Sequence, residues 1–338
     1  MTGYMWPIEG ASKAKRLRWG AQQNYTSWAY MKEMREKDRT RRVYDINPYI
    51  EVYQFRENVY GLFNQNCDGA GDVWQYVIIG PEKAMLIDTA FGIGDIKGLV
   101  DEITGGMPLI VANTHSGPDH CMGNVLFDRV YCHEYDVYNI THKCRPGAWD
   151  YLFDESGNNI WLQFDKKDVP EYRDYELIPV PNHHIFNLGG SYNVEAVWLP
   201  GHDSGHLAFL DHGSRILFAG DVVCSDVMGV GSGGRPEDPY HKYCTIEAYR
   251  DELAKLCRRL DEFDYIMPGH FMVNLENSVL LNILEALNEI MKDPQGYDYC
   301  EMRAGGASFN KRMAYFKFVK NFSAISYNPD KGVFIPDE

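Results

Sequence analysis

Four apolar runs in the chain each lead, within a few residues, into a histidine or an aspartate. The runs cover residues 109–112, 194–199, 216–218 and 265–267, and the polar residues that follow them are His115, His202, Asp221 and His270. Short runs rich in β-branched and aromatic residues, bounded by Gly, Asn and Pro, predict strands. Loops at strand ends are where a scaffold presents reactive side chains. The chain is therefore predicted to build its chemistry at the ends of several strands.

The remaining pattern predicts two β-sheets with helices packed outside them. Further strand-like runs occupy residues 50–55, 59–63, 73–79 and 84–88. Apolar residues at helical spacing predict helices near residues 25–37, 96–103, 246–263 and 277–291, and Asp95 is the expected N-cap of the second. Residues 211–214 are typical of a hairpin turn, whereas the aromatic residues 296–338 carry no interpretable motif. Runs of strands with helices between and after them favour an α+β architecture.

The charge balance argues against nucleic acid as a partner. The 33 basic and 48 acidic side chains give a net charge of −15, and an acidic surface repels phosphate backbones. Ten basic residues nevertheless fall between Lys13 and Arg42, against three acidic ones. We expect this basic arm to dock on its own acidic body or on a neighbouring subunit, which makes a homo-oligomer possible. A small molecule is the expected substrate.

Cysteine usage and hydropathy favour a cytoplasmic protein. No apolar run approaches the roughly 18 residues that a membrane-spanning helix needs, and residues 1–18 lack the apolar segment of a secretory signal. The eight cysteines form no C-x-x-C pair, and a chain of this size does not depend on disulfides to fold. Reduced thiols and no membrane association are expected.

One loop concentrates metal-binding side chains. In the segment Thr114-His115-Ser116-Gly117-Pro118-Asp119-His120, two imidazoles and a carboxylate fall within six positions after a strand. Imidazole and carboxylate are the groups that hold zinc or non-haem iron in proteins. Three later segments carry the same kinds of side chain: Pro200-Gly201-His202-Asp203-Ser204-Gly205-His206, Gly220-Asp221, and Pro268-Gly269-His270. The sequence therefore predicts a metal centre.

Together, these four segments resemble the metallo-β-lactamase superfamily. That family has a His-x-His-x-Asp-His loop after a strand, then Pro-Gly-His-x-x-Gly-His, Gly-Asp and a late Pro-Gly-His, and the order and spacing match over roughly residues 50–292. The resemblance implies a four-layer αββα sandwich with metal at one edge of the sheets. We divide the chain accordingly into a basic N-terminal arm with a helix (1–49), the family domain (50–292) and a C-terminal aromatic tail packed on it (293–338).

The resemblance also implies a set of metal ligands. His115 and His202 would serve a first metal, Asp119, His120 and His270 a second, and Asp221 would bridge both. His206 matches a structural histidine of the family rather than a ligand. The departure is Gly117, which stands where the family has a second histidine in the loop.

Glycine has no side chain to donate, so the first site has only two family ligands and the bridge. Either that site is weak or empty and the enzyme holds one metal, or water or another residue completes it. Candidates for the missing ligand are Ser116, His183, His184 and His241, and Cys121 and Cys224 also neighbour predicted ligands. If Gly117 has a positive φ, a histidine introduced there would be strained by about 1–2 kcal/mol.

The expected activity is metal-dependent hydrolysis. A divalent metal lowers the pKa of bound water towards ~7, and the resulting hydroxide would attack an ester, lactone, thioester or amide of a small molecule. Asp119 is the candidate catalytic residue, because it can orient the nucleophile as well as bind metal. Zinc is the expected metal, as one or two ions, although iron and manganese accept the same ligands. Alternatives are a small-molecule phosphodiesterase, an iron redox protein, or a non-catalytic descendant that binds a ligand.

Overall fold

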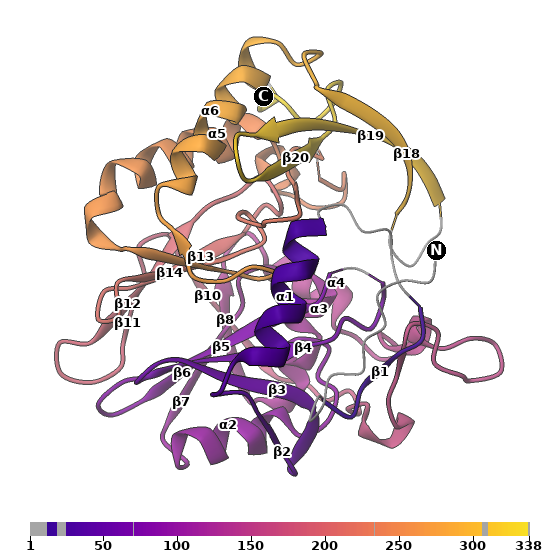
Figure 1. Ribbon diagram of the computed structural model, residues 1–338, viewed down its shortest axis with the longest axis vertical. Helices are drawn as coiled ribbons and strands as arrows, with labels where there is room; N and C mark the ends of the chain where they lie inside the picture. Colours follow the sequence, from indigo (N-terminus) through magenta and orange to yellow (C-terminus); the bar gives the residue numbers. More distant parts are fainter. Residues whose placement is uncertain (1–11, 19–24, 70, 233, 306–309, 337–338) are drawn as a thin grey trace.

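Two stacked β-sheets form the centre of the molecule (Figure 1). The computed structural model describes residues 12–18, 25–69, 71–232, 234–305 and 310–336. An eight-stranded sheet has the order β10-β8-β7-β6-β5-β4-β3-β2. Its strands are β2 (Arg42–Tyr44), β3 (Asn47–Arg56), β4 (Val59–Asn64), β5 (Val73–Ile79), β6 (Ala84–Ile87), β7 (Leu109–Ala112), β8 (Arg129–His133) and β10 (Glu176–Val180).

The second sheet has six strands in the order β11-β12-β13-β14-β16-β17. They are β11 (Ile185–Asn187), β12 (Asn193–Trp198), β13 (Leu207–Asp211), β14 (Ile216–Gly220), β16 (Tyr265–Pro268) and β17 (Leu275–Glu276). The turn at residues 211–214 joins β13 and β14 as an antiparallel hairpin, as the sequence predicts.

Helices cover the outer faces of both sheets. The helix α2 (Ile96–Thr104) packs on the eight-stranded sheet, and α5 (Ile246–Leu256) and α6 (Val279–Lys292) pack on the six-stranded one (Figure 1). Apolar side chains fill the space between the sheets and continue beneath α5 and α6, while a separate core lies under α2. These layers confirm the predicted αββα sandwich.

Helix α2 illustrates how the local sequence sets an element. Asp95 accepts a hydrogen bond from the backbone N–H of Gly98, which satisfies one free donor of the first turn. Gly105 ends the helix in the left-handed conformation, with φ of 68°, which glycine adopts without a steric penalty. Between them Ile96, Leu99 and Val100 are buried on one face, as the helical spacing predicts.

Strand direction brings the candidate site residues to one edge. In the second sheet β12 and β14 are both antiparallel to β13, and β14 is parallel to β16, so β12, β14 and β16 run the same way. In the first sheet β6 and β7 are parallel. The loops that follow these strands carry His202, Asp221, His270 and His115. Because the carboxyl ends of strands that run the same way meet at one edge of a sheet, the loops converge.

The tail contains a sheet that the sequence analysis did not foresee. The strands β18 (Tyr299–Gly305), β19 (Asn310–Val319) and β20 (Ser323–Tyr327) form an antiparallel group, and β15 (Val227–Gly229) adds to β20 in parallel. Helix α6 contacts β19, so the sheet packs on the sandwich. The division at residues 49 and 292 stays a prediction, although β2 and the first residues of β3 already belong to the main sheet.

The described part of the basic arm docks on its own chain. Helix α1 (Tyr25–Lys37) lies where the sequence predicts it, and its Arg35 makes two hydrogen bonds, of 2.9 and 2.6 Å, with the fully buried carboxylate of Glu51 on β3. Burial alone would raise the pKa of Glu51, but the hydrogen bonds and charge of Arg35 lower it below its usual range. Among the described residues, no helix is both long and apolar enough to cross a membrane.

Arg35→Met is expected to destabilise the protein by about 3–5 kcal/mol at neutral pH, because it leaves a buried carboxylate without its partner. In the parent protein the lowered pKa makes Glu51 contribute stability above about pH 4.3, its unfolded value, and lose it as the pH falls further. Without Arg35, burial raises the pKa of Glu51 instead, so the difference between the two proteins shrinks in acid. Urea unfolding at several pH values measures this.

Lys37→Met is the matched control, because it removes an exposed ion pair with Glu33 on the same helix. Exposed pairs contribute little to stability, so its unfolding midpoint should stay at the parent value. Equal midpoints for Arg35→Met and the parent would contradict the role assigned to Arg35.

Candidate metal centre

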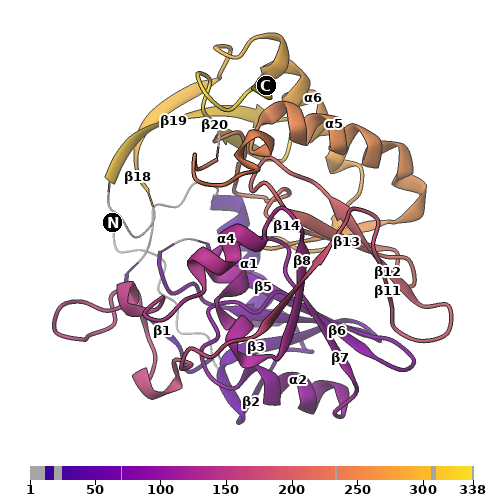
Figure 2. The same ribbon diagram turned by 180° about the vertical axis from the view of Figure 1, so that it is seen from behind.

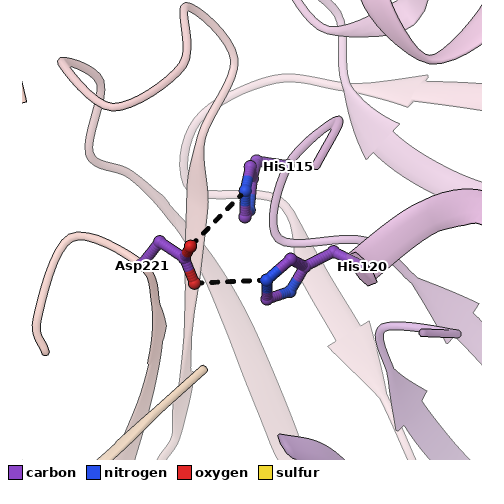
Figure 3. Close-up of side chains that lie close together, drawn as sticks. All are labelled: His115, His120 and Asp221. Carbon is purple, nitrogen blue, oxygen red and sulfur yellow. Dashed lines mark ion pairs between the residues drawn. The ribbon is translucent and has the colours of Figure 1, made fainter. Parts of the chain in front are cut away.

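The predicted ligands meet at the edge where the two sheets end. His115 and His120 come from the segment after β7, and Asp221 faces them from the segment after β14 (Figure 3). His115 and His120 have ring centroids 4.3 Å apart, and the ring of His202 lies 4.8 Å from that of His115. His120 and His270 approach to 3.3 Å between their Nε2 atoms. The structure thus brings these five residues into one cluster.

Asp221 lies at the centre of the cluster. Its Oδ1 is 3.2 Å from Nε2 of His120, and its Oδ2 is 3.2 Å from Nε2 of His270. The same Oδ2 lies 3.7 Å from His202 and 3.9 Å from His115, also measured to Nε2. One carboxylate therefore faces all four imidazoles, which is the position that a bridging ligand requires.

Asp119 approaches the cluster from α3 (Pro118–Cys121). Its Oδ2 lies 3.6 Å from Nε2 of His270 and accepts a hydrogen bond of 3.1 Å from Nδ2 of Asn66. Its Oδ1 lies 3.8 Å from Nε2 of His120. The amide of Asn66 thus fixes one oxygen of Asp119 and leaves the other directed towards the histidines.

In three of the histidines the outer nitrogen, Nδ1, which lies on the side of the ring away from Asp221, contacts an oxygen atom. Nδ1 of His120 lies 2.8 Å from Oδ2 of Asp88. Nδ1 of His270 lies 2.9 Å from the carbonyl oxygen of Asp72, and Nδ1 of His202 lies 2.6 Å from that of Gly229. A carbonyl oxygen only accepts, so Nδ1 carries the proton in His270 and His202, and the carboxylate favours the same form in His120. Nε2 is then the nitrogen that is available to a metal when it loses its proton, and in all three rings it lies within 3.7 Å of Asp221.

Asp88 is a functional residue that the sequence analysis missed. It follows β6 in the left-handed conformation, with φ of 64°. Its carboxylate accepts hydrogen bonds from the backbone N–H and the hydroxyl of Thr114, at 2.7 and 2.8 Å, in addition to its contact with His120. Asp88, at the end of β6, therefore contacts both the first and the last residue of the ligand loop 114–120. The signal was present, since Asp88 also directly follows an apolar strand.

The basic arm supports the opposite side of the site. Arg16 pairs with the carboxylate of Asp72, and its guanidinium also donates to the carbonyl oxygen of Asn66 at 2.6 Å. Asn66 and Asp72 are the residues that hold Asp119 and His270. The arm therefore braces the loop that positions two of the predicted ligands.

The donor set fits a divalent cation. The Oδ1 atom of Asp221 is buried and accepts no hydrogen bond of good geometry within the described residues. Burial opposes charge on His270, but the charge of Asp221 and its hydrogen bond raise the pKa of that imidazole to about 9. Burial lowers the pKa of His115 well below its usual range, which keeps this ring neutral. Carboxylates that attract positive charge, together with imidazoles that release their protons when a metal binds, are what a zinc-type site requires.

Gly117 has an ordinary backbone, with φ of −54° and ψ of 133°. The positive φ that would have strained a histidine here is absent. The obstacle is steric instead, because a Cβ on Gly117 would lie 2.6 Å from Nε2 of His115 and 3.1 Å from Oδ1 of Asp119. A side chain at this position requires the ring of His115 to turn.

The candidate substitutes for the missing ligand point elsewhere in the described structure. Ser116 bonds to Asp203 and Lys143. His183 contacts Glu195, His184 stacks near Tyr131 and Phe186, and Nδ1 of His241 lies 2.7 Å from the carbonyl oxygen of Asp238. The thiol of Cys121 contacts Cys144, and Cys224 accepts from the N–H of Asp226. Within the described residues, none of these side chains joins the cluster around Asp221.

His206 takes part in the structure of the site without facing its centre. It is fully buried, and its Nε2 accepts the backbone N–H of Asp221 at 3.1 Å. Burial, reinforced by the charge of His202, lowers the pKa of His206 to about 3.

A second group of side chains that could bind a metal lies away from this centre and consists of Glu195, His212 and Glu262. The guanidinium of Arg259 already neutralises the charge of the two glutamates.

The fold agrees with a comparison to known protein families. The family description "Metallo-beta-lactamase superfamily" matches residues 68–270, which is more than half of the chain. The chain therefore belongs to the metallo-beta-lactamase superfamily, and it is a metal-dependent hydrolase in the general sense of that family.

Two curated relatives are hydrolases. The human acyl-coenzyme A thioesterase MBLAC2 is 22% identical over 236 residues, covering 65% of this chain and 78% of its own. The hydroxyacylglutathione hydrolase GloC of Haemophilus influenzae is 34% identical over 87 residues, covering 25% of this chain and 36% of its own. Among solved structures, a metallo-beta-lactamase from Pontibacter korlensis covers 71% of this chain and 99% of its own, with 17% identity and a TM-score of 0.49.

Asp88→Asn is expected to weaken metal binding about 10- to 100-fold, which is the usual cost of removing a partner that orients a ligand. Asparagine accepts the left-handed backbone of position 88, so the change acts mainly on the hydrogen bonds to Thr114 and His120. Competition with a chromogenic chelator measures the affinity.

Asp211→Asn is the control, because Asp211 is an equally buried carboxylate whose hydrogen bonds come from Gly213 on the β13–β14 hairpin and from the hydroxyl of Tyr192, outside the cluster of predicted ligands. It should lower the unfolding temperature without changing metal affinity. If both variants bind metal as tightly as the parent protein, Asp88 does not orient His120.

Proposed function

We propose that the chain hydrolyses thioesters of small molecules with zinc held by His115, Asp119, His120, His202, Asp221 and His270. The observation that carries the proposal is the convergence of four Nε2 atoms and two carboxylates at one strand edge. The choice of thioester is supported by the names of the two relatives, since both describe enzymes that release an acyl group from a thiol.

A divalent metal in such a site supplies a Lewis acid for the acyl carbonyl and lowers the pKa of water. Three of the histidines supply fixed geometry, because Nδ1 is held by Asp88 in His120, by Asp72 in His270 and by Gly229 in His202. Fixing these groups before reaction removes much of the reorganisation that would otherwise oppose the chemical step.

Asp119 is the residue proposed to handle the proton. Asn66 donates to its Oδ2, so Oδ1 is the oxygen left to accept a proton from the attacking water. Gly117 lies directly beside His115 and Asp119 and carries no side chain, so a carbonyl group of a substrate would approach the metal next to this residue. Positioning the water and the carbonyl on the same side of Asp119 would convert a bimolecular encounter into an intramolecular one.

A cytoplasmic location accompanies this proposal. All eight cysteines are free thiols, and Sγ of Cys121 and Cys144 lie 3.4 Å apart without a covalent bond. Two buried thiols this close together stay reduced in a reducing compartment. Assembly through the basic arm remains a prediction, since the described part of the arm contacts its own chain.

Asp119→Ala and His270→Ala are each expected to lower kcat/KM for a short-chain thioester at least about 100-fold, the range for a residue that transfers a proton or holds the reactive centre. Release of free thiol, followed with a chromogenic disulfide, measures turnover. His212→Ala is the control, because it removes a half-exposed histidine on the distant hairpin. Undiminished turnover in a correctly folded Asp119 or His270 variant would refute the mechanism.

Protein purified without added metal is expected to hold about one tightly bound metal per chain. The ligands of the second site form a set of four, whereas the first site has two histidines and the shared Asp221, and tetrahedral sites with three protein ligands keep an open position. Gly117→His should raise the content towards two, as measured by elemental analysis after dialysis.

Gly117→Ala separates the two effects of that substitution. It introduces the same close approach of a Cβ to His115 but no ligand, so its metal content should not exceed that of the parent protein. Two tight equivalents in the parent, unchanged by Gly117→His, would show that another group already completes the first site.

A further inference from the structure

A cavity of about 420 Å³ lies beside the ligand loop. Its volume falls within the roughly 300–1,000 Å³ range of small-molecule sites. It is formed by α3, the end of α4 (Val137–Lys143), the segment after α4, and the loop after β15. The segment after α4 extends outward from the sandwich next to β1 (Lys15–Arg16) (Figure 2). The lining residues that matter here are Pro118, Lys143, Arg145, Asp150, Tyr151 and Arg235.

The cavity is positively charged in a strongly acidic protein. It brings together three cationic side chains and one carboxylate, although the chain as a whole carries a net charge of −15. Arg145 and Arg235 are exposed, and neither forms an ion pair or a side-chain hydrogen bond with any residue that the structure describes. Other exposed arginines of the described chain do form ion pairs, namely Arg129, Arg173 and Arg215. Cations concentrated in a concave surface attract anions.

The cavity adjoins the loop that carries three of the predicted ligands. Pro118, on its wall, lies between Gly117 and Asp119 in the ligand loop. Nζ of Lys143 donates to Oγ of Ser116 at 2.6 Å, one residue from His115. A ligand in the cavity therefore lies against the same loop that holds the reactive centre.

We propose that this cavity binds the thiol half of the substrate, and that this half carries phosphate or carboxylate groups held by Arg145, Arg235 and Lys143. The inference rests on the proposed thioesterase function. Guanidinium groups pair with phosphate and carboxylate through two parallel hydrogen bonds, which gives both strength and orientation. Small thiols that carry acyl groups are themselves charged, whereas their acyl chains are commonly apolar, so a cationic cavity fits the thiol side.

Three thioesters of one acyl group test the proposal on the metal-loaded full chain. Their thiols are coenzyme A, which carries phosphates, glutathione, which carries carboxylates, and N-acetylcysteamine, which has no charge. We expect kcat/KM for at least one charged thioester to exceed that for the uncharged one, mainly through KM. The advantage should shrink as salt is added, because screening weakens attraction between exposed charges.

The double variant Arg145→Gln, Arg235→Gln should reduce that preference about tenfold or more, as expected for the loss of charge-assisted hydrogen bonds. Asp150→Asn should act in the opposite direction, because it removes the one carboxylate among the cavity residues named above. Arg258→Gln is the matched control: Arg258 is also exposed, but it bonds to the carbonyl oxygen of Ala254 at the far end of α5. It should leave the preference unchanged.

The outcomes separate the two proposals. A preference for coenzyme A or for glutathione supports the inference and identifies phosphate or carboxylate as the bound group. Equal kcat/KM for all three thioesters, or a preference unaffected by the double variant, overturns the inference while leaving the thioesterase function intact. Hydrolysis of no thioester overturns the function. Calorimetric binding of adenosine 3′,5′-bisphosphate and S-methylglutathione then tests the cavity directly, and failure of both to bind overturns the inference.

Discussion

Two carboxylates and four imidazoles share a space only a few ångströms wide, and positive charge between them is what makes this arrangement stable. The carboxylates of Asp119 and Asp221 repel one another, and the inward nitrogens of the histidines are lone pairs once their outer nitrogens donate to oxygen. Burial strengthens that repulsion, because screening by water is lost. Much of the surrounding structure holds these groups in place against it, and a cation between them removes the cost.

The groups that hold the ligands come from three separate parts of the chain. Asp88, after β6, orients His120 and the loop that follows β7. The segment from Asn66 to Asp72 holds Asp119 and His270, and Arg16 of the basic arm secures that segment. A change in the arm would therefore act on the metal centre through Asn66 and Asp72, which are not themselves predicted ligands. In this sense the arm belongs to the site, although it lies outside the family match at residues 68–270.

Sequence patterns predicted the elements whose signals are local. The N-cap Asp95, the helix 25–37, the hairpin at 211–214 and the strands that end near the ligands are all present, because each depends on residues a few positions apart. Asp88 was missed because its partners belong to a neighbouring strand, and only the parallel pairing of β6 and β7 brings them together. In the sheet of the tail only the pairing of β15 with β20 is distant, at about a hundred residues. The strands β18, β19 and β20 follow one another along the chain, and the sequence analysis found no interpretable motif in them. The roles assigned to the ligands remain predictions.

Gly117 connects the metal centre with the cavity. Its lack of a side chain removes a ligand from one side of the site, and even a Cβ here would lie 2.6 Å from Nε2 of His115. The next residue, Pro118, already forms part of the cavity wall. The loop therefore carries the missing ligand and a wall of the cavity at adjacent positions. Under the proposed function, a substrate that extends from the cations of the cavity to the ligands would run along this loop, so the weakened first metal site and the bound thiol half would lie on the same part of the chain.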